Sequence, residues 1–273
     1  MNYKTFNADT IPLAQLYEPA NTYAIEHDHD YLENSASENF LKQIHVTSIT
    51  EDAALGIEKT TRGQAENPTW FAERRFRLHA SKFGAICATK DKRKMAANLV
   101  CHTRVQAAAV NHGRLFEGTA ISQYEQQCNA QVQRGVGITV SLDRPYLACS
   151  PDGIRDGCTL VEVKCPYSAR NSQITPETVP YLYLDENTGL FALDKSHNYY
   201  FQIQGQLFIT RKKVCLLIVY TFKDMAVIQI SRDDAFIDTM NANLELFFND
   251  YFKPALLEKF FYRNYVAFDF ASR

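Results

Sequence analysis

Two acids and a lysine stand at a spacing that suits metal-dependent hydrolysis. Nine residues separate Asp152 from Glu162, which leaves room for a strand, a tight turn through Asp156-Gly157 and a second strand. The run 158–165 alternates between apolar and other residues, so Glu162 and Lys164 should point to the same face. A hairpin would bring Asp152 beside that face. Two carboxylates would then converge on one hard cation, Mg²⁺ or Mn²⁺, with an ammonium group close by.

A simpler interpretation of Glu162 and Lys164 is a solvated ion pair on a strand, which is the commoner meaning of Glu-x-Lys. Two features favour chemistry here. The neighbours Leu160, Val161 and Val163 are apolar and predict a half-buried strand. The turn at 151–153 also holds its acid at the end of a strand, next to Ala148-Cys149.

Hydrolysis of a phosphodiester needs an attacking water, neutralisation of phosphate charge and help for the leaving oxygen. Asp152 and Glu162 would ligate the metal, and the backbone carbonyl of Val163 is a further candidate ligand. Lys164 would either orient or deprotonate the water, or stabilise the charge of the pentavalent phosphorus. Glu117, on a long expected helix, could complete the site directly or through a metal-bound water; taken alone, it is better explained as an exposed helical glutamate.

A glutamine pair supplies a second candidate group. On a helix Gln202 and Gln206 share one face, four residues apart. An amide near a metal centre can hydrogen-bond a bound water or the phosphate. The alternative is a solvent-exposed polar stripe.

The elements that must position these residues alternate between helical and extended patterns, which predicts an α/β (α+β) fold with a mixed central sheet flanked by helices and an N-terminal helical appendage. A capping box at Ser48–Glu51 and the start signal Asn67-Pro68 mark two helix beginnings. A proline- and glycine-containing loop should follow residue 165. Helices are expected over 37–46, 48–60, 68–77, 81–86, 104–127, 198–210 and from 233 past 248, and strands over 132–140, 145–148, 158–165, 213–220 and 226–230.

The composition bounds the class of protein. A hydrophobic content of 46% with 12% aromatic residues in 273 residues is typical of a globular chain with a sizeable core. No apolar run approaches 18 residues, and the N-terminus lacks a secretory pattern, so we expect neither a membrane span nor secretion. Seven scattered cysteines without Cys-x-x-Cys favour an intracellular, reducing compartment, cytoplasm or nucleus, and argue against an iron–sulfur or structural zinc site.

The charge is uneven along the chain. Residues 1–67 carry 4 basic and 11 acidic side chains, whereas residues 68–130 carry 10 basic and 4 acidic ones. A basic block is typical of a surface that follows phosphates. The cluster at 90–94 fits DNA contact and a solvated loop equally well. The alternation His27-Asp28-His29-Asp30 points successive side chains to opposite faces, which disfavours a metal site there.

Five segments together resemble the YqaJ-like viral recombinase family, which includes the phage lambda-type exonuclease and belongs to the PD-(D/E)xK nucleases. Their order and intervals match over about residues 68–230. Any one of them is a weak signal, but five in register are strong. The segments are Trp70 with 73–84, 113–117, 149–153, 162–166 and 200–204.

The resemblance implies a restriction-endonuclease-like core in residues 68–273, with residues 1–67 as an acidic, partly helical extension. It implies a Mg²⁺-dependent 5′→3′ exonuclease on double-stranded DNA ends, with Mn²⁺ able to substitute, that acts in end resection and recombination. A single-strand annealing protein and a homotrimer are the partners it suggests. The alternatives are a DNA-end-binding module that does not cut, and a site-specific or structure-specific endonuclease on the same core.

The resemblance also assigns roles. Asp152 and Glu162 match the metal ligands, Lys164 the catalytic lysine, Glu117 the helical acid and Gln202 the active-site glutamine. Three further residues match the pocket for a terminal 5′-phosphate: Arg74, Ser81 and Ser150. Guanidinium and hydroxyl groups suit that ligand. The chain departs from the family at His79, where Thr or Ser is usual, which weakens the expected helix cap and alters the pocket.

Overall fold

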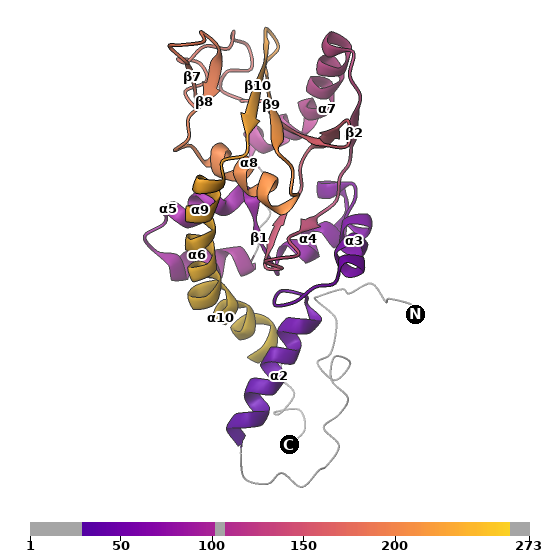
Figure 1. Ribbon diagram of the computed structural model, residues 1–273, viewed down its shortest axis with the longest axis vertical. Coiled ribbons are helices and arrows are strands. Elements are labelled where there is room, and N and C mark those ends of the chain that lie inside the picture. Colours follow the sequence, from indigo (N-terminus) through magenta and orange to yellow (C-terminus); the bar gives the residue numbers. More distant parts are fainter. Residues whose placement is uncertain (1–28, 102–106, 263–273) are drawn as a thin grey trace.

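The computed structural model describes residues 29–101 and 107–262, in which a sheet lies between helices and α2 projects at one end (Figure 1). The central sheet has the order β10-β9-β6-β5-β2. Strands β6 and β9 are parallel, and the other neighbours are antiparallel. Its strands are β2 (Val132–Arg134), β5 (Gly153–Arg155), β6 (Thr159–Lys164), β9 (Val214–Tyr220) and β10 (Met225–Ser231). Among the described residues no helix is long and apolar enough to cross a membrane.

Two smaller sheets complete the strand set. One has the order β1-β4-β3, with β1 (Leu78–His79), β3 (Thr139–Val140) and β4 (Leu147–Cys149). The other is the pair β7 (Leu182–Leu184) and β8 (Phe191–Leu193). The helices are α2 (His29–Gln43), α3 (Glu51–Thr60), α4 (Pro68–Arg74), α5 (Phe83–Ala88), α6 (Lys92–Cys101), α7 (Ala108–Cys128), α8 (Asn198–Ile209), α9 (Asp234–Phe247) and α10 (Lys253–Leu256).

The β5–β6 hairpin confirms the turn expected from the sequence. Asp156 and Gly157 have φ angles of 53° and 67°, and the N–H of Cys158 donates to the carbonyl of Arg155 at 3.2 Å. Two consecutive positive φ angles are the signature of a type I′ turn, which Asp-Gly adopts readily. The hairpin pairs Gly153 with Val161 and so places Asp152 beside the end of β6.

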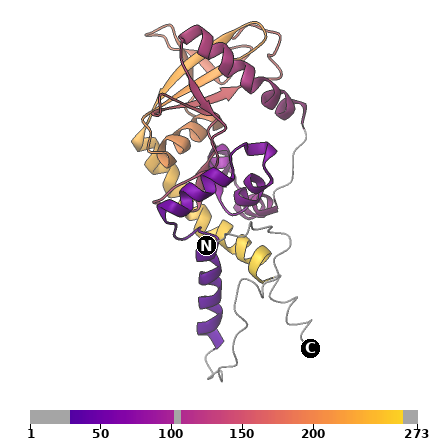
Figure 2. The same ribbon diagram turned by 90° about the vertical axis from the view of Figure 1, so that its right-hand side faces the viewer.

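Helices α7 and α8 lie on opposite sides of the sheet (Figure 2), and alternation along β6 sends its side chains towards one or the other. On one face Val161 and Val163 pack with Tyr124 of α7. On the other face Leu160 packs with Ile203 of α8. Glu162 and Lys164 belong to the α8 face, because they stand two and four residues after Leu160. The mixed α/β class predicted from the sequence is confirmed.

Helix α8 lies close against the segment that carries Ser81, one of the predicted phosphate-pocket residues. That segment is a 3₁₀ turn, η2 (Ala80–Lys82), followed by α5. A Cβ on Gly205 would stand 2.5 Å from Cδ2 of Phe83, inside any allowed contact. The glycine therefore sets the distance between α8 and this segment.

Substitution of Gly205 by alanine is expected to destabilise the protein by about 1–3 kcal/mol, because the Phe83 ring cannot yield without repacking. Urea unfolding measures the effect as a lower midpoint at unchanged slope. Gly113→Ala is the matched control, since nothing lies within 4 Å of its added Cβ and alanine favours a helix. Equal midpoints for the two variants would contradict the packing account.

The segment before Pro68 packs into the body of the protein. Phe40, Leu41 and Val46 belong to the largest buried cluster, and the Thr61 hydroxyl accepts from the N–H of Ile138 at 2.7 Å. A division at residue 67 stays a prediction. Helix α2 begins at His29, earlier than expected, while His27 and Asp28 lie outside the described residues. The cap of α3 is Thr50, whose side chain accepts from Ala53, and the predicted capping box at Ser48 was wrong.

Several expected elements have different bounds. The strand expected over 132–140 is two strands in two sheets, because glycines at 135 and 137 redirect the chain: Gly135 has φ +71°, and a Cβ on Gly137 would lie 1.9 Å from the carbonyl of Glu58. The basic cluster at 90–94 leads into helix α6, so a simple loop was wrong for Lys92 onward. The loop after residue 165 carries β7 and β8, and the first described residue of the long helix is Ala108. The last helix continues through the π-turns η3 (Phe248–Phe252) and η4 (Leu257–Tyr262).

Candidate active site

Asp152 lies beside β6 just beyond the point where the backbone pairing of β5 with β6 ends. The pairing of β5 with β6 ends at Gly153 and Val161, and β6 runs three residues further. There the Asp152 carboxylate accepts from the N–H of Val163 at 2.7 Å. The N–H and C=O groups of one strand residue point to the same edge. The Val163 carbonyl, predicted as a ligand, therefore faces the edge on which Asp152 lies.

Glu162 is the most buried of the acids, with 2% of its surface exposed. Its Oε1 accepts from Lys164 Nζ at 2.5 Å and from Gln202 Nε2 at 2.6 Å, and its Oε2 accepts from Gln206 Nε2 at 2.7 Å. Lys164 also donates to Gln202 Oε1 at 3.4 Å and lies 4.6 Å from the ring centre of Tyr199. Both glutamines thus face the strand, and the exposed polar stripe considered for them does not occur.

The charge of Glu162 acts on the pKa of its two neighbouring acids. Burial raises the pKa of Asp152 well above its usual value, and the charges of Glu162 and Glu117 add to the rise. Burial and the charge of Glu162 likewise raise the pKa of Glu117, which is half-buried on α7. Burial opposes the charge of Lys164, but Glu162 and Asp152 outweigh it and raise its pKa, so the amine is an ammonium group. Such a cluster of acids favours a cation.

The donor chemistry of the site fits a hard divalent ion. Asp152, Glu162 and Glu117 offer carboxylate oxygens, and Val163 offers a carbonyl oxygen. Within residues 29–101 and 107–262 no group of three His, Cys, Asp or Glu side chains already converges on one metal position. The oxygens of Glu162 accept from Lys164 and two glutamines. Asp152 and Glu162 are the residues that would hold an ion.

Arg74 and both predicted serines meet in one small pocket. Arg74 Nη2 donates to Ser81 Oγ at 3.4 Å, and the guanidinium lies 4.2 Å from the ring centre of Trp70. Trp70 Nε1 in turn donates to Ser150 Oγ at 3.0 Å. Burial lowers the pKa of Arg74 to about 10, which leaves it charged at neutral pH. Gln202 and Gln206 line the same pocket, so it adjoins the acids.

The resemblance assigned no role to Trp70 or Gln206, although Gln206 was a candidate as the helical partner of Gln202, and it noted His79 only as a departure. His79 gives no side-chain cap to η2, as its type suggested, and its Nδ1 lies 2.9 Å from Arg74 Nη1. Because a guanidinium only donates, Nδ1 must accept, and His79 carries its proton on Nε2. Helical spacing held usable signals, since Trp70 stands four residues before Arg74 and Gln206 four after Gln202. The pairing of His79 had no local signal.

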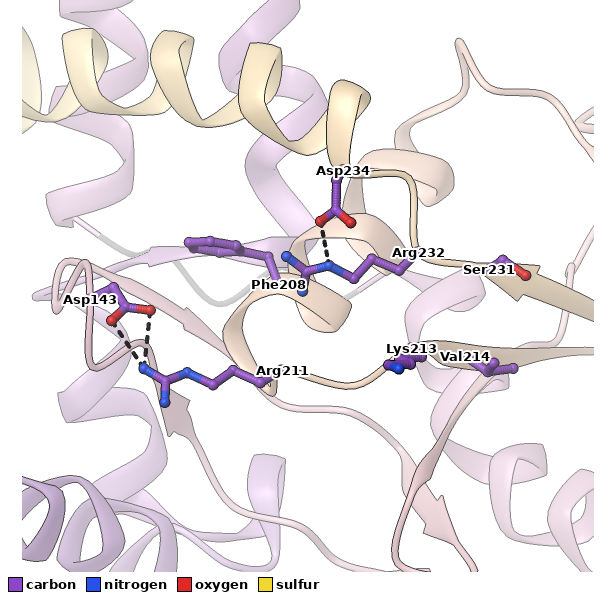
Figure 3. Close-up of a pocket in the computed structure, with 8 residues that line it drawn as sticks. All are labelled: Asp143, Phe208, Arg211, Lys213, Val214, Ser231, Arg232 and Asp234. Atoms are coloured by element: carbon purple, nitrogen blue, oxygen red, sulfur yellow. Dashed lines mark hydrogen bonds and ion pairs between the residues drawn. The ribbon is translucent and has the colours of Figure 1, made fainter.

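A larger cavity lies elsewhere. It has a volume of about 650 Å³ and sits where β9 begins, at Val214, whereas Lys164 pairs with Val219 near the other end of that strand. Figure 3 shows four of its charged side chains held in two pairs, Arg211 with Asp143 and Arg232 with Asp234. The acids of the candidate active site do not line this cavity.

A mixed β-sheet between helices, with a hairpin that presents two acids and a lysine, defines a restriction-endonuclease-like protein. The YqaJ-like viral recombinase domain matches residues 69–213, and the chain belongs to that family. A curated relative, the alkaline nuclease of Orgyia pseudotsugata multicapsid polyhedrosis virus, is 26% identical over 209 residues. This match covers 69% of the chain and 48% of the viral protein, so the chain spans about half the length of that relative.

Solved structures share the fold. The alkaline exonuclease LHK-Exo of Laribacter hongkongensis superposes with a TM-score of 0.55 at 24% identity, over 74% of this chain and 97% of that one. A phage-related exonuclease of Haemophilus somnus 129PT gives 0.52 at 13%, over 67% and 96%. The shutoff and exonuclease protein of Kaposi's sarcoma-associated herpesvirus gives 0.51 at 9%, over 81% and 74%. At these identities the likeness shows the fold alone.

Proposed function

We propose that the chain is a DNA-hydrolysing enzyme, a Mg²⁺-dependent 5′→3′ exonuclease on double-stranded ends, with its nuclease domain in residues 68–273. The observation that supports this most is the direct link between two sites. Gln202 donates to Glu162 and lines the pocket that contains Arg74. A group that grips a terminal phosphate therefore lies next to acids suited to cutting the adjoining bond.

Each residue has a definite task in this proposal. A bound Mg²⁺ would supply charge neutralisation and an acidified water. Asp152 and Glu162 would hold it, with Val163 and Glu117 in support. The sequence allows Lys164 either to remove a proton or to donate one. Its raised pKa favours donation, so we assign it to orienting the water or to stabilising charge on the phosphate.

The phosphate pocket favours an exonuclease over an endonuclease. Arg74, Ser81 and Ser150 offer donors suited to a phosphate monoester, which exists only at a strand end. The cluster of acids also argues against a silent end-binding module, because such a module has no use for like charges brought together at this cost. We extend the proposal to end resection beside a single-strand annealing protein and to a trimer.

A test uses linear duplex DNA labelled at either strand end and carrying a 5′-phosphate or a 5′-hydroxyl. With Mg²⁺ we expect nucleotides to be released from the 5′ end and preferentially from phosphorylated ends, with no release in EDTA. Equal cutting of covalently closed circles would show an endonuclease instead. End binding without any product would show a silent module.

Replacement of Arg74 by lysine is expected to abolish most of the preference for 5′-phosphorylated ends. Lysine keeps the charge but loses the two-pronged geometry that fits a phosphate and the stacking on Trp70. Loss of one charge-assisted hydrogen bond costs about 1.5–3 kcal/mol, roughly 10- to 150-fold in KM for phosphorylated ends. The measurement compares KM for the two kinds of end.

Arg62→Lys is the control for this comparison, since Arg62 is an exposed arginine paired with Glu58 on α3. It should leave both KM values unchanged. An Arg74→Lys enzyme that still distinguishes the two ends as well as the wild type would remove Arg74 from the pocket's function.

A further inference from the structure

Four rings from three separate segments form one cluster beside the acids. His112 and Phe116 lie one turn apart on α7, with ring centres 4.7 Å apart. Tyr167 comes from the loop after β6, and Phe222 from the turn between β9 and β10; their ring centres lie 5.5 and 5.6 Å from that of His112. Phe116 and Phe222 meet edge to face at 4.8 Å.

The two outer rings of this cluster are open to solvent. Phe222 is 45% exposed and Tyr167 39% exposed, whereas His112 is buried beneath them. Both outer rings contact His112 in T-shaped geometry. An aromatic ring held through its inner contacts keeps outer surface available for a further partner.

Backbone bonds hold the two outer segments together. The N–H of Phe222 donates to the carbonyl of Arg170 at 2.8 Å, and the Thr221 hydroxyl donates to the carbonyl of Ser172 at 2.8 Å. The loop after β6 and the β9–β10 turn therefore form one preorganised surface, which reduces the ordering cost of binding.

Basic side chains lie on the same segments as the rings. The Arg170 guanidinium lies 4.1 Å from the ring centre of Tyr167 and donates to its carbonyl at 2.7 Å. Arg114 and Lys223 are exposed on α7 and on the β9–β10 turn. The acid of that turn, Asp224, accepts from the backbone N–H groups of Ile174 and Met225. Rings interleaved with positive charge are the pattern by which proteins bind single-stranded nucleic acid.

The position of the cluster relates it to the cutting site. Phe116 directly precedes Glu117, and Tyr167 stands three residues after Lys164. Phe116 also packs against the buried cluster that contains Val163 and Cys165, so the rings adjoin the strand that carries the acids. A DNA strand that passes the acids would therefore also meet these rings.

We propose that Tyr167 and Phe222 form a stacking surface for unpaired bases of single-stranded DNA at the rim of the active site. This inference rests on the proposed function, because it takes DNA as the ligand. The rings bind base faces, and Arg114, Arg170 and Lys223 attract the phosphates. The surface thus separates an unpaired strand from the duplex that is being cut.

The test measures binding of the full chain to a fluorescently labelled oligothymidylate in EDTA, where no cleavage occurs, by anisotropy. Phe222→Ala and Tyr167→Ala are each expected to weaken binding about 5- to 150-fold, the range for loss of one stacked base. Tyr167→Phe should bind as the wild type does. Tyr183→Ala is the matched control, because Tyr183 is a 46% exposed aromatic on β7 and outside this cluster.

An abasic strand of the same length separates stacking from phosphate attraction. The wild type should prefer the strand with bases, and Phe222→Ala should lose that preference. Equal affinity of the wild type for both strands, or unchanged binding by Phe222→Ala and Tyr167→Ala, would overturn the inference. Because binding is measured in EDTA, the two proposals can fail separately. A protein that does not cut DNA but still needs Phe222 to bind the oligothymidylate would refute the proposed nuclease and support the stacking surface.

Discussion

Replacing Lys164 by alanine is expected to lower the rate of phosphodiester cleavage by about 10²- to 10⁴-fold, the usual loss for a positioned proton donor or charge stabiliser. The reason lies in its surroundings. The ammonium group is held by Glu162 at 2.5 Å and by Gln202 at 3.4 Å, so it occupies one place and needs no reorganisation during the reaction. No other lysine among the described residues contacts these acids by hydrogen bond.

Release of labelled nucleotides from linear duplex in single-turnover conditions measures this loss. Lys195→Ala is the matched control, because Lys195 also pairs with a carboxylate, Asp233, and lies over a tyrosine ring, yet is exposed. It should retain full activity. Lys164→Gln keeps an N–H donor for Glu162 and guards against a simple folding defect. Wild-type rates in folded Lys164→Ala would refute the site.

Replacing Asp152 by asparagine is expected to abolish cleavage and, in metal-free buffer, to stabilise the protein by about 0.5–2 kcal/mol. The carboxyl pKa of Asp152 is raised in the folded state, so folding favours its neutral form. The stability from that preference is full below the unfolded pKa of about 3.9 and is lost as pH rises through the folded pKa. At neutral pH the charged group therefore weakens the fold. Asparagine removes the charge and can still accept from Val163.

Thermal unfolding in EDTA between pH 5 and pH 8 measures the difference in melting temperature between Asp152→Asn and the wild type. This difference should increase with pH, and each kcal/mol of stability corresponds to about 2–4 °C. Asp156→Asn on the exposed hairpin turn is the control and should change stability by less than about 0.5 kcal/mol. A divalent ion that binds the acids should stabilise the wild type and close the gap. A lower melting temperature for Asp152→Asn at every pH would contradict the electrostatic account.

Local patterns predicted the hairpin well. Alternation over 158–165 placed Glu162 and Lys164 on one face, and Asp156-Gly157 supplied the turn that returns Asp152 to it. The start of α4 at Pro68, capped by Asn67, and the extent of α8 were likewise confirmed. These features depend on residues close together in the chain, so their signals are complete in a short window.

Other features escaped because their causes lie far apart in the chain. The strand expected over 132–140 divides at two glycines, and the need for glycine at 137 arises from the carbonyl of Glu58, some eighty residues earlier. Phe40 and Leu41 looked like part of an appendage, but they pack in the largest core cluster. The start of α2 and the short strands β7 and β8 have weak periodicity of their own, and tertiary contacts override so weak a preference.

The sequence by itself determined which groups are available for chemistry: two acids and a lysine on one hairpin, and glutamines one turn apart on a helix. Local geometry suffices for that, since a strand alternates and a helix repeats. Only the tertiary structure decided what those groups touch. In the folded protein Gln206 bonds Glu162, His79 bonds Arg74, and Trp70 bonds Ser150, eighty positions away. Tertiary packing selects these partners, and the neighbouring residues in the sequence do not specify them.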